Sequence, residues 1–279
     1  MAMLRCPGCG LLWLQQKILE DTHYHSLDIG VNDAKAVRRK RNVADRVRTI
    51  GGYIPLDSTC DIGTGDGAFL QALGDSGYQR CWGIEPSQQG AEFGTSHGLD
   101  VIQGTIDSLP ALAEQKKPAV ITLFHVIEHL DHPKKDLETL FNALPSGGHL
   151  VLETPNLRGY SPRTIGYAWE LFYPEHLWYF DDRTLPKLLQ SVGFQIVASG
   201  IRDFDMAGKG IGELLFRLGL KKGSKKKLPA HTSGSKQANS PPSPSTPSLP
   251  GLGIIRWVLR LLVQWRGNVD YVWVIAKKP

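Results

Sequence analysis

Short apolar runs alternate along the chain with segments whose apolar residues recur every three or four positions. Seven runs have the length of buried strands: Thr59–Gly63, Cys81–Glu85, Val101–Gly104, Ala119–Val126, His149–Glu153, Gln195–Ile201 and Tyr271–Ala276. Helical spacing fits five segments: Asn32–Thr49, Gly67–Asp75, Ser87–His97, Lys134–Leu144 and Asp182–Val192. Strands that alternate with helices of about ten residues predict βαβ units and a mostly parallel sheet with helices on both faces.

A segment of different composition separates the last two predicted strands. Its middle, residues 221–250, is rich in Lys, Ser and Pro and predicts a disordered linker, because it has too little apolar surface to bury. Ile211–Leu220 and Gly253–Trp265 flank the linker and are predicted as amphipathic helices. We therefore expect an α/β domain at residues 32–204 and 268–279, with an insert at residues 205–267.

The chain has 279 residues, four cysteines and a formal net charge of +5 that is concentrated in short clusters. This excess is compatible with an anionic membrane surface or an anionic substrate. No recognition module for nucleic acid is visible, so we expect none as a partner. The first residues lack the apolar core of a secretory signal, and no apolar run reaches the length of a bilayer span. These features favour a cytoplasmic protein with free thiols.

Residues 1–31 are predicted to form a truncated segment similar to a zinc ribbon. Cys6 and Cys9, separated by Pro and Gly, have the spacing of a zinc knuckle. A structural zinc site needs four ligands, and no second Cys-x-x-Cys pair is present. The pair is therefore either half of a zinc site or a turn that binds no metal. His23 and His25 would be weak substitutes for the missing thiolates.

The sharpest chemical signal is the glycine-rich sequence DIGTGDG at Asp61–Gly67, which joins the first predicted strand to a helix. Glycines allow a tight turn and a close approach of the backbone to a ligand. Glu85 ends the next strand, where a carboxylate can accept hydrogen bonds from ribose hydroxyls. The spacing differs from the G-x-G-x-x-G pattern of dehydrogenases, which argues against a dinucleotide site.

In this setting the chain resembles class I S-adenosylmethionine (SAM)-dependent methyltransferases, in particular the ubiquinone-biosynthesis-like group. The similarity lies in six segments: Asp61–Gly67, Gly83–Ser87 (GIEPS), His125–Leu130 (HVIEHL), Leu144–Asn156, Pro174–Phe180 (PEHLWYF) and Asp270–Pro279. The resemblance implies a Rossmann-like sheet of seven strands. It also implies that the last strand is antiparallel and inserted beside the fifth.

The resemblance also implies which residues contact SAM. Those residues are Asp61, Gly63, Gly65, Gly67, Glu85, Thr105, Ile106 and His125. The glycines would line the methionine end, Glu85 the ribose, Thr105 and Ile106 the adenine, and His125 the sulfonium. Thr105 departs from the family, in which an acidic residue is common at this position, so the adenine contact would come from backbone or hydroxyl groups.

Three histidines are candidate catalytic residues: His125, His129 and His176. SAM carries an activated methyl group, so the protein mainly positions the acceptor and removes its proton. Alternatively, Glu128 and His129 brace the following loop. Glu128, His129 and His176 are also a candidate site for a divalent metal, since two imidazoles and a carboxylate suit Zn²⁺, Mn²⁺ or Fe²⁺.

The predicted function is transfer of a methyl group from SAM to a hydroxyl of a small or lipid-linked acceptor. The alternatives are an N- or C-methyltransferase of another small molecule, or a non-catalytic SAM-fold module that binds a partner. In the second flanking helix, Arg256 and Arg260 share one face and tryptophans lie near both ends. This pattern suits peripheral contact with an anionic membrane at its inner face, or alternatively a lid over the acceptor site.

Overall fold

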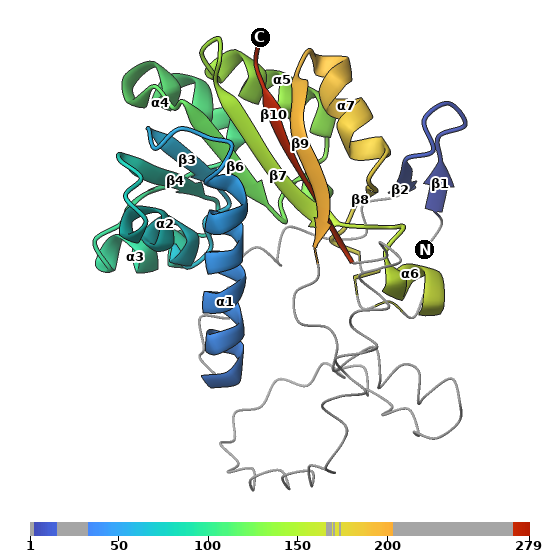
Figure 1. The fold of residues 1–279 in the computed structure, drawn as a ribbon, viewed down its shortest axis with the longest axis horizontal. Helices are drawn as coiled ribbons and strands as arrows, with labels where there is room; N and C mark the ends of the chain where they lie inside the picture. The colour runs from blue at the N-terminus through green and yellow to red at the C-terminus, as the bar shows by residue number, and fades with distance from the viewer. Residues whose placement is uncertain (1–2, 16–32, 166–168, 170, 173, 203–269) are drawn as a thin grey trace, which may run out of the picture. The chain divides into compact units, whose positions relative to one another are not determined.

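The computed structural model describes residues 3–15, 33–165, 169, 171–172, 174–202 and 270–279. Its main feature is a seven-stranded sheet with the order β5-β4-β3-β6-β7-β10-β9 (Figure 1). The strands are β3 (Thr59–Ile62), β4 (Cys81–Glu85), β5 (Asp100–Gln103), β6 (Val120–Phe124), β7 (His149–Pro155), β9 (Gln195–Arg202) and β10 (Tyr271–Lys277).

Strand direction follows the prediction. The pairings among β3, β4, β5, β6 and β7 are parallel, whereas β10 is antiparallel to both β7 and β9. The last strand is therefore inserted beside β7, the fifth of the predicted strands. This confirms the Rossmann-like α/β fold with a mostly parallel sheet.

Seven α-helices connect or flank these strands in the described residues: α1 (Asp33–Ile50), α2 (Ala68–Asp75), α3 (Gln88–Ser96), α4 (Leu109–Lys116), α5 (Pro133–Ala143), α6 (Tyr160–Ile165) and α7 (Thr184–Val192). The sequence analysis did not predict α4, because only Leu109 of this helix is buried and its apolar periodicity is weak. Two short 3₁₀ turns, η2 (Ile106–Ser108) and η3 (Ile127–His129), follow β5 and β6.

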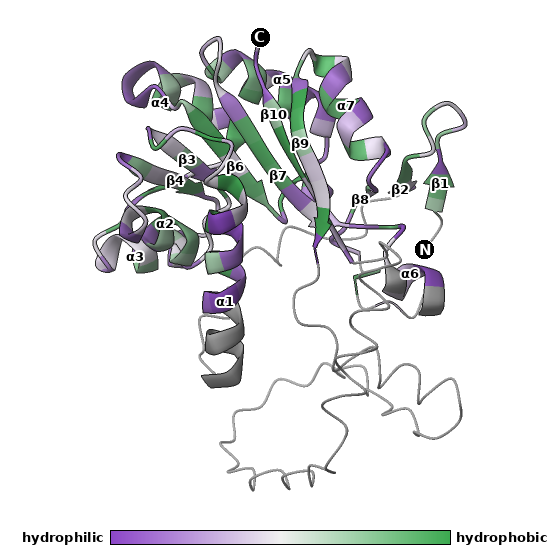
Figure 2. Cartoon of the chain, viewed as in Figure 1, coloured by the Kyte–Doolittle hydropathy of each residue, from purple (hydrophilic) through white to green (hydrophobic). Residues whose placement is uncertain are grey.

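Helices cover both faces of the sheet. Alternate residues of a strand point to opposite faces, and the core divides accordingly. Val151 packs in a cluster with residues of α1 and α2, whereas its neighbours Leu150 and Leu152 pack with residues of α4, α5 and α7. Figure 2 shows mostly hydrophobic residues along the central strands and a mixture of hydrophilic and hydrophobic residues along the helices.

A second sheet has three short strands in the order β1-β2-β8. They are β1 (Met3–Arg5), β2 (Leu12–Leu14) and β8 (Trp178–Tyr179). Strands of two or three residues carry too few positions to show an alternating pattern, so the sequence did not predict this sheet. It places the N-terminal hairpin beside the segment that carries His176.

The predicted insert at residues 205–267 lies outside the described residues, with both of its helices and the linker 221–250. His23 and His25 lie outside them too. None of the helices that the structure describes combines the length and the apolar character of a bilayer-spanning helix.

Candidate cofactor and catalytic site

The glycine-rich turn between β3 and α2 depends on left-handed backbone. Gly63, Gly65 and Gly67 have φ values of 74°, 58° and 74°, a region in which residues with a β-carbon are strained. A β-carbon added to Gly63 would lie 2.6 Å from Cγ2 of Val126. Gly67 is the N-cap of α2, so the helix begins at Ala68 and not at the predicted Gly67.

Glu85 at the end of β4 lies directly against this turn. Its Oε2 accepts a hydrogen bond from the Gly65 backbone N–H at 2.8 Å, and its Oε1 accepts one from the Ser87 N–H at 3.0 Å. Burial raises the pKa of the Glu85 carboxyl despite these two donors. An ionised carboxylate offers about four acceptor positions, so one bond from the turn and one from the start of α3 are compatible with the predicted contact to a ribose.

Asp61 is buried in β3, and its Oδ1 accepts a hydrogen bond from the Thr122 hydroxyl of β6 at 2.5 Å. Burial raises the pKa of Asp61 to about 7, and the Thr122 hydroxyl opposes that shift. In these contacts Asp61 joins two strands, while Glu85 holds the turn itself.

Thr105 and Ile106 follow β5, as the sequence predicted. The Gly104 N–H donates to the Glu85 carbonyl oxygen at 3.0 Å, which places this segment beside the end of β4. The Ile106 side chain is buried in the main core cluster, so of the two residues only Thr105 is exposed.

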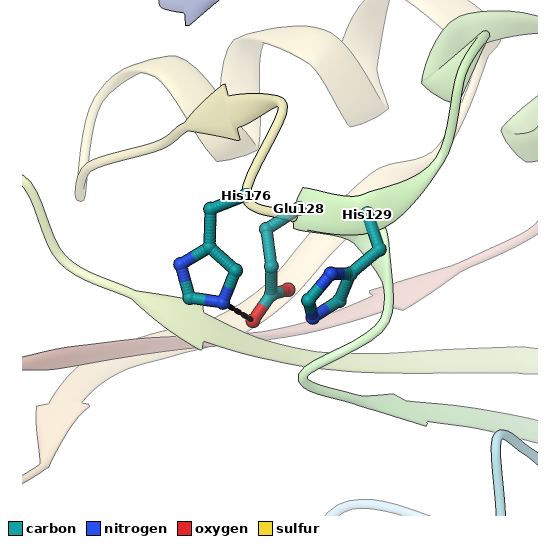
Figure 3. Close-up of side chains that lie close together, drawn as sticks. All are labelled: Glu128, His129 and His176. Atoms are coloured by element: carbon teal, nitrogen blue, oxygen red, sulfur yellow. Dashed lines mark ion pairs between the residues drawn. The ribbon is translucent and has the colours of Figure 1, made fainter. Parts of the chain in front are cut away.

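Glu128, His129 and His176 come together after β6. Figure 3 shows the two imidazoles on either side of the Glu128 carboxylate. One ligand atom from each residue lies within 4.8 Å of the others, and Glu128 and His176 are buried. His176 reaches the cluster from the segment before β8, where the Leu177 N–H donates to the Glu128 carbonyl oxygen at 2.8 Å.

Backbone carbonyls orient both rings. Nδ1 of His129 lies 2.9 Å from the Glu175 carbonyl oxygen, and Nδ1 of His176 lies 2.9 Å from that of Leu171. A carbonyl oxygen only accepts, so each Nδ1 must donate, and the neutral ring then carries its lone pair on Nε2. Burial lowers the pKa of His176 to about 4, although Glu128 opposes the shift, so this ring is neutral at physiological pH.

Glu128 is the central anion of the cluster. Its Oε2 accepts a hydrogen bond from the Thr154 hydroxyl at 2.9 Å. Its buried Oε1 accepts no well-formed hydrogen bond and lies 3.4 Å from Nδ1 of His125 and 4.0 Å from Nε2 of His176. Burial would raise the pKa of Glu128, but the neighbouring imidazoles, His125 above all, outweigh it and lower the pKa.

These three residues fit a divalent metal by their chemistry. A buried carboxylate oxygen without a good donor and imidazoles held through Nδ1 are the donor set and outer-shell support of protein metal sites. Ligands that bind one ion at about 2.0–2.2 Å lie up to roughly 4.4 Å apart, so small side-chain rotations would complete the geometry.

His125 belongs to a second group of buried charges that the sequence analysis did not identify. It has a φ of 59°, and its Nε2 lies 3.5 Å from Oε1 of Glu153 in β7. Arg46 of α1 donates to the same oxygen from Nε at 3.0 Å and from Nη2 at 2.7 Å. Arg202 Nε lies 3.5 Å from Glu153 Oε2.

The charges in this group support one another. Burial alone would raise the pKa of Glu153, but Arg46, His125 and Arg202 lower it to about 2. Burial would lower the pKa of His125, but Glu128 and Glu153 outweigh it and raise the pKa. His125 therefore lies between two carboxylates that raise its pKa, whereas burial lowers the pKa of His176.

Two signals in the sequence pointed to this group. Arg46 occupies the helix face that carries the buried Val43 and Ile50, and Glu153 interrupts an apolar strand. A charged residue at an apolar position indicates a buried partner.

The aromatic stretch before α7 mainly forms core. Trp169, Tyr179 and Phe180 are buried, and Phe172 packs edge-on against Trp169 with ring centroids 5.1 Å apart. These contacts fit a packed loop better than a free acceptor pocket. Tyr173 lies outside the described residues.

With this geometry in place, comparison with known proteins gives the family. Residues 36–199 match the methyltransferase domain family. This match covers more than half of the chain, so the chain belongs to that family. The cofactor expected from the sequence, SAM, is the one that this membership supports. The narrower ubiquinone-biosynthesis-like group remains a prediction.

Solved structures share the fold. A SAM-dependent methyltransferase from Archaeoglobus fulgidus is 19% identical, with a TM-score of 0.56 over 88% of this chain and 100% of that one. A possible histamine N-methyltransferase from Thermotoga maritima is 16% identical, with a TM-score of 0.52 over 88% and 96%. A phosphoethanolamine-type N-methyltransferase from Haemonchus contortus, in complex with phosphomonomethylethanolamine and S-adenosylhomocysteine, is 13% identical, with a TM-score of 0.53 over 86% and 52%. No curated protein sequence matches the chain.

Proposed function

We propose that this protein transfers a methyl group from SAM to a hydroxyl of a small or lipid-linked acceptor. The observation that carries the proposal is the left-handed turn of Gly63, Gly65 and Gly67, held by the Glu85 carboxylate at the carboxyl ends of parallel strands. Ligands of open α/β sheets bind at this edge. The family membership and the Haemonchus enzyme bound to S-adenosylhomocysteine support the same cofactor.

The protein would contribute position and proton transfer. SAM supplies an electrophilic methyl group when it is bound. The turn admits it closely because no β-carbon intervenes, while Asp61, Thr105, Ile106 and His125 complete the proposed cofactor contacts. His125 lies at the end of β6, where its contacts with Glu128 and Glu153 hold the left-handed backbone after the strand.

Removal of the hydroxyl proton is assigned to the histidine cluster. The neutral His176 carries a lone pair on Nε2, and the other two members of the cluster, Glu128 and His129, lie three and four residues beyond His125 on η3. A general base of this kind contributes roughly 10²–10⁴-fold to a rate. A divalent ion held by Glu128, His129 and His176 would instead lower the pKa of the acceptor hydroxyl directly.

One experiment distinguishes a cluster that acts through a bound metal ion from a cluster that acts as a general base. Dialysis against a strong chelator should leave S-adenosylhomocysteine binding intact and abolish methyl transfer if the cluster works through an ion. Undiminished transfer after dialysis, with no metal found by elemental analysis, would assign the cluster to proton transfer alone.

The cofactor assignment is tested by calorimetric titration with S-adenosylhomocysteine. Glu85→Gln should weaken binding by about 10–100-fold, because a charged acceptor of hydrogen bonds contributes roughly 1.5–3 kcal/mol. Glu92→Gln, on the exposed side of α3, is the matched control and should bind normally. Equal affinity of the Glu85 variant and the wild type would remove the ribose contact from the proposal.

The acceptor is tested by a screen. Purified protein and methyl-labelled SAM would be incubated with lipid and soluble extracts, and the labelled products identified by mass spectrometry. An O-methylated product supports the proposal. Methylation only on nitrogen or carbon would replace it with the alternative activities, and binding of cofactor without any product would favour a non-catalytic module.

We further propose that the protein is cytoplasmic with peripheral contact at the inner face of a membrane. The support is the basic and aromatic pattern of the insert in the sequence. Flotation with anionic vesicles at low salt should recover the protein with the lipid. Protein that stays at the bottom of the gradient would leave the insert as a lid or a linker.

A further inference from the structure

The N-terminal hairpin presents two cysteines on an exposed turn. The turn between β1 and β2 is closed by backbone hydrogen bonds from the Gly10 N–H to the Cys6 carbonyl oxygen at 2.9 Å and from the Cys6 N–H to that of Leu11 at 2.8 Å. Cys6 is partly exposed and Cys9 is exposed. Both thiols are therefore accessible at the same tight turn.

This turn favours a thiolate. The Cys9 backbone N–H points at Sγ of Cys6 over 3.5 Å. N–H groups directed at a sulfur stabilise its anionic form, which is the form that binds metals. The turn therefore offers two preorganised soft ligands, the kind that Zn²⁺ prefers.

The hairpin holds the turn on a fixed support. β2 pairs with β8 through Leu12 and Trp13, and the Leu14 N–H donates to the Leu177 carbonyl oxygen at 2.9 Å. Trp13 and Trp178 stack with ring centroids 6.1 Å apart. The cysteines are thus carried on a small sheet at the far end from these contacts, where a partner can reach them.

The rest of the described chain does not complete a zinc site at this turn. A structural zinc ion takes four ligands. The other two cysteines, Cys60 and Cys81, belong to β3 and β4 of the central sheet. Among the described residues, the one group of three or more metal-ligating side chains close together is Glu128, His129 and His176. Any further ligands therefore lie outside the described residues or on another molecule.

We propose that Cys6 and Cys9 form half of an intermolecular zinc site, completed by the same two cysteines of a second copy of this chain. Two exposed, identical pairs related by a two-fold axis supply four thiolates around one ion, and a two-fold axis is the commonest symmetry of protein dimers. Four thiols bind one Zn²⁺ and release four protons to solvent, two from each chain. The ion would link two catalytic units through their N-terminal hairpins.

Cobalt is the probe for this site, because thiolate-to-cobalt charge transfer gives an absorption band that a carboxylate–imidazole site lacks. The reduced, metal-free full chain would be titrated with Co²⁺ and then Zn²⁺. The band should saturate at about one Co²⁺ per two chains, Zn²⁺ should bleach it, and light scattering after chromatography should show a doubled mass.

Three variants make the outcome decisive. Cys6→Ser and Cys9→Ser should each abolish the band and the dimer, with unchanged circular dichroism showing that the fold is intact. Cys81→Ser removes a thiol of the central sheet and should leave both signals unchanged. The double variant His23→Ala/His25→Ala should also keep them.

Three results would overturn the proposal. They are a titration end point of one ion per chain with monomeric protein, loss of the band in the double histidine variant, and the absence of a thiolate band in the wild type. None of these measurements depends on methyl transfer or on cofactor binding, so the site is tested separately from the proposed function.

Discussion

The glycine-rich turn and the histidine cluster follow neighbouring strands, β3 and β6, but they are built differently. The turn consists of backbone geometry over Asp61–Gly67, with one carboxylate, Glu85, holding it. The cluster consists of one buried carboxylate and two oriented imidazole rings, from η3 and from the segment before β8. His125 connects it to Glu153 of β7, and Arg46 of α1 donates to Glu153. The first region shapes a surface for a ligand, and the second controls protonation.

This difference indicates a division of labour. A turn without β-carbons selects a ligand by shape and by backbone hydrogen bonds, and none of its three glycines carries a titratable side chain. Near the cluster, Glu128 and Glu153 raise the pKa of His125, whereas burial lowers that of His176 to about 4, and shifted pKa values of this kind are typical of sites that move protons. Changes in the two regions should therefore have separable effects on binding and on turnover.

The largest effect is expected in the cluster. Glu128→Gln or His176→Ala should reduce the rate of methyl transfer by about 10²–10⁴-fold, because each removes a member of the proton-transfer group. The affinity for S-adenosylhomocysteine should stay within about 3-fold, as neither residue touches the glycine turn. Turnover with labelled SAM and calorimetry measure the two quantities.

His132→Ala is the control for this pair, since His132 lies three residues from His129 but is exposed at the start of α5. It should keep both rate and affinity. A parallel loss of affinity in the Glu128 or His176 variant would mean that the two regions form a single binding site, and the division of labour would fail.

Among the charges around Glu153, Arg46 should contribute most to the free energy of unfolding. Arg46→Met leaves Glu153 buried beside fewer cations, and breaking a buried pair costs about 3–5 kcal/mol of unfolding free energy. Arg48, two residues further along α1, pairs with Asp45 at the surface, so Arg48→Met should cost under about 1 kcal/mol. Urea unfolding of the two variants measures the difference. Similar midpoints would show that Glu153 does not anchor α1.

The sequence predicted these two regions unequally, for a physical reason. Glycine spacing, a preceding strand and Glu85 about twenty residues later are local features, so the turn could be read from the chain and its residues fell where expected. The Glu128–His129–His176 group was also anticipated, but from a family resemblance. Arg46, Glu153 and Arg202 were missed, since Arg46 and Glu153 lie 107 positions apart and Arg202 reaches Glu153 from a different strand.

The same argument covers the fold. The first six strands of the central sheet alternate regularly with helices, and the seventh follows the insert. The sequence predicted all seven strands. It missed α4, α6 and the sheet of β1, β2 and β8, because these elements are short and show little periodicity. Short elements are defined by tertiary contacts, which no local pattern reports.

A smaller effect is expected from strain in the turn. Gly63→Ala places a β-carbon in left-handed backbone and against Val126, so binding of S-adenosylhomocysteine should weaken by about 10–100-fold while the cluster is untouched. The matched control is Gly77→Ala, whose φ is 87° with no atom within 4 Å of the added carbon. It carries the backbone strain alone, about 1–2 kcal/mol of stability, and should bind normally. Equal binding losses in both variants would point to general destabilisation.

The smallest net effect concerns Asp61, and its sign should change with pH. Burial raises its pKa to about 7 from an ordinary value of 3.8, so the folded state holds a proton that the unfolded state releases. Stability is therefore lost as pH rises from about 4 to about 7, by roughly 4 kcal/mol in all at about 1.4 kcal/mol per pH unit. Asp61→Asn removes this dependence but buries an amide whose donors are incompletely paired, at a cost of about 1–3 kcal/mol.

Urea unfolding at several pH values should thus find Asp61→Asn less stable than the wild type near about pH 4 and more stable by about 1–2 kcal/mol near about pH 8. Thr122→Val removes the donor to Asp61 and should act in the opposite direction at high pH, since the hydroxyl stabilises the charged carboxylate. A difference between Asp61→Asn and the wild type that is constant across this range would mean that Asp61 titrates normally. Asp61, in the strand before the glycine turn, would then cause no change of stability with pH over this range. Proton transfer at this edge of the sheet would be the role of the histidine cluster alone.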